Sequence, residues 1–175
     1  MFALQNDSFA GFDLPLVERA RQVLPMTTLQ RFELALSANA ALGPLLLRVG
    51  LGTVFLAHAY AKAFVFTLPG TVKFFQNYGL PGWAAYPVFL LELFGGLSLL
   101  LGVHTQLVAV LLIPVMLGAL VPHQANGWMF TNTGGGWEYV AFLIVALAAQ
   151  AVLGGGAYSM SRTPNSNVAS AGMRA

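Results

Sequence analysis

The apolar stretch Leu45–Leu68 constrains the fold of this chain more than any other feature. It runs for 24 residues between two prolines, which is long enough to cross a bilayer as a helix that rises about 1.5 Å per residue. It nevertheless carries Arg48, His58 and Lys62. Ionisable groups in hydrocarbon cost about 2.5–3.5 kcal/mol each and therefore normally face protein or water. The other segments must supply partners for these three side chains.

Composition assigns the chain to the membrane class. Hydrophobic residues make up 57% of the sequence and charged residues only 8%, whereas a soluble domain has about 25% charged residues. The mean hydropathy is +0.72. The formal net charge of +2 comes from scattered groups without a basic cluster, so a nucleic-acid partner is not expected.

The absence of cysteine limits the chemistry that the chain can perform. With no cysteine, it cannot carry out dithiol chemistry, ligate an iron–sulfur cluster or form a disulfide. Any redox role must then use a bound organic cofactor, a metal on histidine and carboxylate ligands, or a partner subunit.

The hydrophobic pattern predicts an all-α integral membrane four-helix bundle with an amphipathic N-terminal extension. Four apolar segments are expected to span the bilayer: Gly43–Leu68, Trp83–Leu101, Thr105–Val121 and Trp137–Gly156. They divide the chain into an extension over residues 1–42, a membrane domain over residues 43–157 and a disordered C-terminal tail over residues 158–175. Pro114 should kink the third span.

The extension has its own helix signals. Asp13 and Pro25 are expected to begin and end one short helix. Thr27 and Gln30 resemble a capping box that opens a second, amphipathic helix. The extension either lies on the membrane surface or docks a partner. Because the start of the chain has no basic region, we expect the first span to act as an uncleaved anchor.

Charge predicts the orientation. Five arginines lie in the two tails, whereas the first and third connections carry only Lys73. The positive-inside rule then places both termini in the cytoplasm. The connections over residues 69–82 and 122–136 share the outer face, and a tight turn at Gly102–His104 lies on the inner face.

The buried polar residues are predicted to lie at similar depths in the membrane. Counted from the outer helix ends, Lys62 lies about 9 Å deep, Glu92 about 13 Å and His58 about 15 Å. A Lys62–Glu92 ion pair beside His58 is the least costly arrangement for these groups. Gly95 and Gly96 share the face of Glu92 and allow a close approach to the first span. Arg48, near the inner boundary, can extend to the membrane surface.

Each of these residues also has a purely structural interpretation. The Lys62–Glu92 pair can serve only to hold two helices together, and a lone interior histidine is more often hydrogen-bonded than a ligand. Glu138 can be a favourable carboxylate at a helix N-terminus. His58 and His123 with the two glutamates offer ligand types that suit zinc, copper or iron, but their spacing forms no metal motif, and no metal site is assigned.

Several segments resemble the DoxX family of small four-helix membrane proteins. They are LLLRVGLGTVFLAHAYAKAF, YGLP, LLELFGGLSLLLGVHTQLVAVLL and GGGWEYVAFL, within about Leu45–Ser159. The resemblance implies a protein of the bacterial cytoplasmic membrane and an oxidoreductase subunit. It is similar to subunits of thiosulfate:quinone oxidoreductase and to membrane partners of thiol and superoxide defence enzymes.

The first functional hypothesis is a quinone-linked redox subunit. Lys62, Glu92 and Glu138 are its candidate catalytic residues, since an amine can donate to a quinone carbonyl and carboxylates can relay protons. Its candidate cofactor-binding residues are His58, His123, Trp137 and Arg48. The alternatives are a non-catalytic scaffold subunit and a small-molecule or proton-coupled carrier. Besides the lipid bilayer, a partner subunit or a second copy of the chain is expected.

Overall fold

The computed structural model describes residues 26–161, and the chain falls into two units, Met1–Asn39 and Ala40–Ala175. Helix α2, Thr28–Ala38, is the described part of the first unit. The predicted capping box is confirmed, because the backbone N–H of Gln30 donates to the Thr27 hydroxyl and that of Thr27 donates to the Gln30 side chain. The predicted helix between Asp13 and Pro25 lies outside the described residues.

The second unit is built on four long helices, and no strand occurs among residues 26–161. They are α3 (Leu42–Tyr60), α5 (Ala85–Leu101), α6 (Thr105–His123) and α7 (Glu138–Leu153). A π-helix, Ala61–Val65, continues α3; one-turn 3₁₀ helices precede α5 (Gly82–Ala84) and follow α6 (Gln124–Asn126). The predicted all-α class is confirmed.

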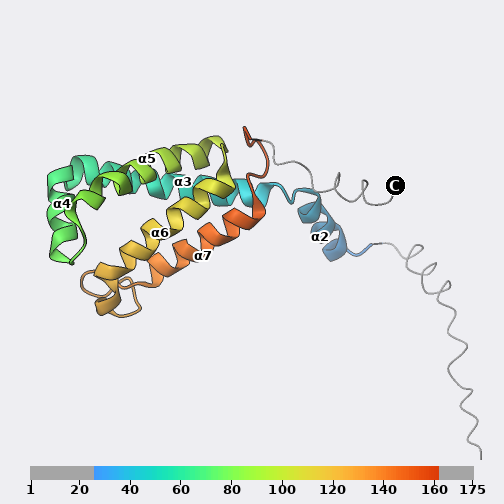
Figure 1. Ribbon diagram of the computed structural model, residues 1–175. Coiled ribbons are helices and arrows are strands. Elements are labelled where there is room, and N and C mark those ends of the chain that lie inside the picture. Colours follow the sequence, from blue (N-terminus) through green and yellow to red (C-terminus); the bar gives the residue numbers. More distant parts are fainter. Residues whose placement is uncertain (1–25, 162–175) are drawn as a thin grey trace, which may run out of the picture. The chain divides into compact units, whose positions relative to one another are not determined.

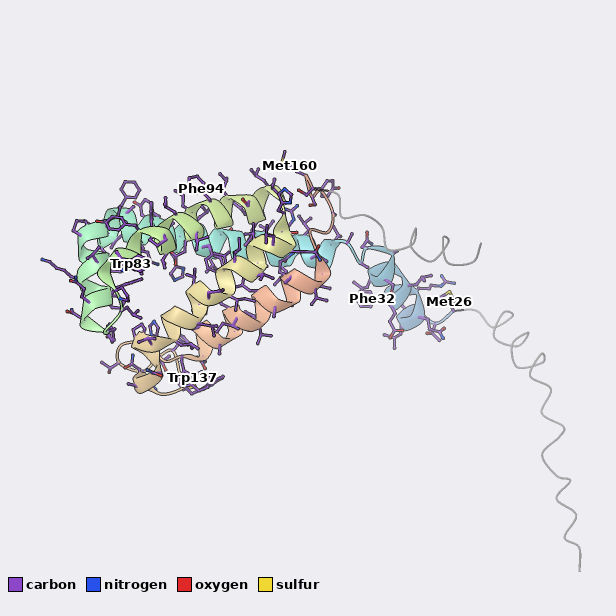
Figure 2. The ribbon with its side chains drawn as sticks, viewed as in Figure 1. Met26, Phe32, Trp83, Phe94, Trp137 and Met160 are labelled. Carbon is purple, nitrogen blue, oxygen red and sulfur yellow. The ribbon has the colours of Figure 1, made fainter. Side chains whose placement is uncertain are left out.

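Three of these helical segments are long and apolar enough to cross a membrane. They are Leu42–Val65, Gly82–Leu101 and Thr105–Asn126, whereas α7 is a shorter apolar helix of 16 residues. The outward faces carry large apolar side chains, such as those of Trp83 and Phe94 (Figure 2), which are 71% and 59% exposed. An apolar exterior is what a lipid environment requires.

The helices are arranged as two pairs. The most extensive contacts join α3 to α5 and α6 to α7. The pairs lie close together near the α5–α6 turn and diverge toward the short helix α4 (Figure 1). We call these two ends of the bundle the Arg48 end and the α4 end. The core is formed by apolar side chains from all four helices, among them Phe55, Leu99, Leu112 and Leu147.

Glycines allow α5 to approach its neighbours closely. A Cβ added to Gly96 would lie 3.0 Å from the Gly52 carbonyl oxygen of α3, which confirms that the first two spans meet at Gly96. Gly95 instead faces Leu112 of α6, so the prediction that both glycines contact the first span was wrong for Gly95. Leu100 of α5 also packs over Gly52.

Helix α4, Leu68–Asn77, was not predicted, because the sequence here was interpreted as a simple connection. Pro69 lies in its first turn, where the missing N–H costs nothing. Thr67 caps the helix by accepting a hydrogen bond from the Gly70 N–H at 3.3 Å. At the other end, Gly79 has a φ of 73° and closes a Schellman motif.

The α5–α6 connection is the predicted tight turn. Gly102 adopts a left-handed conformation with φ 72°, and the Val103 N–H reaches back to the Ser98 carbonyl. The chain after α7 returns to this turn, where the N–H of Ser161 donates to the Gly102 carbonyl. Residues 158–161, the start of the predicted tail, are therefore hydrogen-bonded to the turn, and residues 162–175 lie outside the described part.

Candidate functional site

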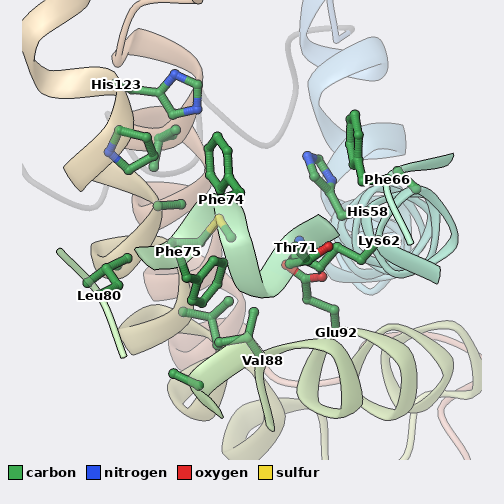
Figure 3. Close-up of a pocket in the computed structure, with 18 of the residues that line it drawn as sticks. His58, Lys62, Phe66, Thr71, Phe74, Phe75, Leu80, Val88, Glu92 and His123 are labelled. Carbon is green, nitrogen blue, oxygen red and sulfur yellow. Dashed lines mark hydrogen bonds and ion pairs between the residues drawn. The ribbon is translucent and has the colours of Figure 1, made fainter. Parts of the chain in front are cut away.

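A cavity of about 650 Å³ lies toward the α4 end. This volume is in the range of small-molecule sites, which are mostly apolar with a few placed polar groups. Its lining comes from α3, the π-helix and helices α4 to α7 (Figure 3). The polar side chains that line it are those of His58, Lys62, Thr71, Glu92, His123 and Tyr139.

Lys62 and Glu92 form the ion pair that their depths predicted. The Lys62 Nζ lies 2.8 Å from Oε1 of Glu92, to which it donates, and 2.7 Å from Oε2. The Glu92 side chain is 2% exposed and that of Lys62 is 16% exposed. Nζ has three donors, so the ammonium can hold the carboxylate and still present an N–H to the cavity.

The backbone around Lys62 is unusual. Lys62 is the second residue of the π-helix Ala61–Val65, and π-turns inside α-helices are rare and occur frequently at functional sites. The chain then turns at Thr67, whose φ of 63° and ψ of 155° belong to a region that is nearly restricted to glycine. The structure thus holds Lys62 on an irregular segment between α3 and α4.

Two histidines line the same cavity from different helices. The His58 Nδ1 of α3 lies 2.9 Å from the Val54 carbonyl, one turn earlier on the same helix. The His123 Nδ1, at the end of α6, lies 2.9 Å from the Gly135 carbonyl in the α6–α7 connection. Figure 3 shows the two rings on different walls of the cavity.

Two predicted site residues at the start of α7 lie outside the cavity lining and contact the α6–α7 connection instead. The carboxylate of Glu138 accepts a hydrogen bond from the Phe130 N–H at 3.0 Å. Trp137 packs edge-on against Trp128, with ring centroids 4.4 Å apart. Both side chains hold the connection together, and the structure does not bring them to Lys62.

Arg48 lies at the opposite end of the bundle, buried to 2% exposure. All five of its N–H donors are taken by backbone carbonyls; the acceptors are Leu99 and Leu100 at the end of α5 and Gly155, Ala157 and Tyr158 after α7. The side chain therefore does not extend to the surface as predicted. It links the end of α5 to the segment that follows α7, and it is not part of the cavity lining.

The sequence analysis did not assign particular aromatic residues to the lining. Phe74 and Phe75 of α4 and Tyr139 of α7 face the cavity. The two phenylalanines were overlooked because α4 was not predicted. Tyr139 directly follows Glu138. The helical period places residues 139, 140 and 143 on one face, so the sequence could have predicted that they line the cavity together.

The comparison with protein families settles what kind of domain surrounds this cavity. A family model described as DoxX matches residues 43–125, which hold helices α3 to α6. Residues 43–125 form a DoxX domain. The DoxX domain supplies Lys62, Glu92 and both histidines, while α7 completes the cavity from outside the matched region.

One curated relative extends this result. The chain is 38% identical over 80 residues to a protein of Bacillus subtilis (strain 168) described as "Putative oxidoreductase CatD". The match covers 46% of this chain and 58% of that protein's length. No solved structure matches the chain. The match to DoxX over residues 43–125 and the three long apolar helical segments both indicate a membrane protein.

Proposed function

We propose that this chain is the membrane subunit of a redox system and that its cavity binds a quinone. The observation that carries the proposal is the Lys62–Glu92 ion pair in the wall of a mostly apolar cavity that is also lined by aromatic side chains. A quinone is an apolar ring with polar carbonyls, so it needs an apolar site with a few polar groups. The description of the Bacillus relative supports a redox role.

In this proposal the polar residues have separate tasks. An N–H of Lys62 donates to a quinone oxygen, and Glu92 orients the ammonium. The phenylalanines of α4 pack against the ring. Because the chain has no cysteine, we propose that a partner redox protein exchanges electrons with the bound quinone.

We also propose a bacterial cytoplasmic-membrane location with both termini in the cytoplasm. The five tail arginines face a single lysine, Lys73, in the two connections at the α4 end. The cavity then opens in the half of the membrane that faces away from the cytoplasm. A quinone can reach it from the lipid, without crossing the Arg48 end.

A structural subunit is the second candidate, because the same ion pair satisfies two charges that would otherwise be unpaired in the membrane. Purification in mild detergent separates the two candidates. The proposal predicts that quinone is extracted from the purified protein, detected by mass spectrometry and ultraviolet absorption, together with a redox partner. Quinone-free protein with an otherwise native melting profile would favour the structural subunit.

A further inference from the structure

The hydrogen bonds of the two cavity histidines determine which ring nitrogen carries the proton. In both rings Nδ1 lies 2.9 Å from a backbone carbonyl oxygen, that of Val54 for His58 and that of Gly135 for His123. A carbonyl oxygen can only accept, so Nδ1 must be the donor. In the neutral ring the remaining nitrogen, Nε2, is then a hydrogen-bond acceptor.

Both Nε2 atoms remain available for a ligand. Within residues 26–161 neither one has a hydrogen-bond partner, and neither is among the fully buried polar atoms that lack a partner. Each therefore keeps accessible surface, and both rings line the cavity. The cavity thus offers an acceptor on the α3 wall and a second acceptor on the α6 wall.

The other charged groups define what such a ligand must present. The Glu92 carboxylate is held by Lys62 and is almost fully buried, which leaves it little capacity to accept from a ligand. Lys62 follows His58 by four residues, so the ammonium and the His58 ring lie on neighbouring turns of one face. A ligand oxygen between them can accept from Lys62, but it must donate to His58.

We infer that this cavity selects the reduced, hydroxyl-bearing form of its aromatic ligand, a hydroquinone, over the quinone. This inference rests on the proposed function and specifies its ligand. A hydroxyl group accepts from Lys62 and donates to the His58 Nε2, and a second hydroxyl donates to the His123 Nε2. A quinone carbonyl has no proton to donate and leaves both acceptors unpaired, which a site built for a hydroxyl rejects strongly.

Binding measurements on three forms of one short-tailed quinone test the inference. The purified full chain in detergent, under anaerobic conditions at pH 8, is dialysed against the quinone, the hydroquinone and the hydroquinone dimethyl ether. We expect the hydroquinone to bind at least about tenfold more tightly than either of the others. The ether keeps the ring and its oxygens but cannot donate, so it isolates the contribution of the hydroxyl protons.

Matched variants assign the preference to the two rings. His58→Phe and His123→Phe should each reduce the hydroquinone preference several-fold, whereas His58→Gln should keep it, because the amide oxygen can accept. His104 lies in the α5–α6 turn, away from the cavity lining, and His104→Phe should leave the preference unchanged. The melting temperature of each variant reports whether it is folded.

Three results would overturn the inference. Equal or tighter binding of the quinone would do so and leave the quinone-binding proposal intact. A hydroquinone preference that survives in both folded phenylalanine variants would remove the assignment to the histidines. No binding of any of the three forms would overturn the inference and the proposed quinone site together.

Discussion

The two cations in the first span are stabilised in different ways. Arg48 distributes its five N–H donors over five backbone carbonyls at the Arg48 end, and a rigid guanidinium fork is well suited to this task. Lys62 instead pairs with one carboxylate and remains 16% exposed beside the cavity. The arrangement of Arg48 leaves no N–H donor for a ligand. The arrangement of Lys62 leaves an N–H that can donate to one.

Arg48→Lys should therefore destabilise the protein although it conserves the charge. An ammonium has three donors in place of five, so at least two of the five carbonyls lose their partner, at a cost of about 1–3 kcal/mol. Thermal melting in detergent measures the effect. Arg31→Lys on the exposed surface of α2 is the control and should change little. Equal melting temperatures for the two variants would contradict the role of Arg48.

At the scale of helices, packing depends on positions where only glycine fits. Gly96 brings α5 so close to α3 that an added Cβ would lie 3.0 Å from backbone atoms of Gly52 and Leu56. Gly50 on α3 has nothing within 4 Å of an added Cβ. Gly96 is therefore required for the close α3–α5 contact, whereas Gly50 is not required for any helix contact.

Gly96→Ala should destabilise the bundle by about 1–3 kcal/mol, because the two helices must move apart. Gly50→Ala should instead stabilise it by about 0.5–1 kcal/mol, since alanine has the higher helix propensity and meets no neighbour. Denaturant or thermal unfolding of both variants in the same detergent makes the comparison. If the two variants shift in the same direction, the assigned α3–α5 contact is incorrect.

The junction between the π-helix and α4 supplies another prediction at this scale. Thr67 has a φ of 63°, a conformation that costs a β-branched residue about 1–3 kcal/mol and glycine little. Thr67→Gly should raise stability, because glycine is also tolerated at an N-cap. Thr67→Val keeps the strain and loses the cap hydroxyl, so it should lower stability. Thermal melting of the two variants measures the difference. A glycine variant that melts below the native chain would contradict the positive φ assigned to Thr67.

The sequence predicted the long helices well because length and hydropathy are local properties. The first, second and third spans begin and end within a few residues of the predicted bounds. Helix α4 was missed because Pro69 was interpreted as the end of one helix, although proline is equally suited to the start of the next. The π-helix at Lys62 has no sequence signature, since its hydrogen bonds depend on the packing around it.

The site was predicted only in part for a similar reason. Lys62 and Glu92 could be paired because few ionisable groups lie at that depth. Depth does not determine where a connection places its side chains, so the loop contacts of Glu138 could not be foreseen. Phe74 and Phe75 of the cavity lining belong to α4 and were therefore missed with it.

The helix bundle of the second unit differs between its two ends. The Arg48 end is closed by hydrogen bonds between the α5–α6 turn and the chain that follows α7. At the α4 end the two helix pairs diverge (Figure 1), and residues from both pairs line the cavity. One end of the bundle is therefore held together by hydrogen bonds, and the other end contains the cavity.

The proposed orientation follows from the positive-inside rule. Reporter domains fused after Asn77 in α4 and after Asn132 in the α6–α7 connection should both be located outside the cytoplasm. A fusion at the C-terminus should be cytoplasmic and serves as the control. A cytoplasmic signal from either Asn77 or Asn132 would reverse the proposed side of the cavity.

The central claim is that Lys62 and Glu92 act on a bound ligand rather than only on each other. Removing one partner leaves a buried charge unpaired, which typically costs about 3–5 kcal/mol. The double variant Lys62→Met with Glu92→Gln removes both charges and should recover most of that stability. Lys73→Met with Glu33→Gln removes the same charges from exposed positions outside the cavity lining and is the matched control.

The decisive measurement is the amount of quinone retained per folded protein in the double variant and in its control. We predict that the control retains quinone as the native chain does, whereas the folded Lys62→Met, Glu92→Gln protein retains little or none. A folded double variant that retains the native amount of quinone would contradict the claim and reduce the ion pair to a structural contact.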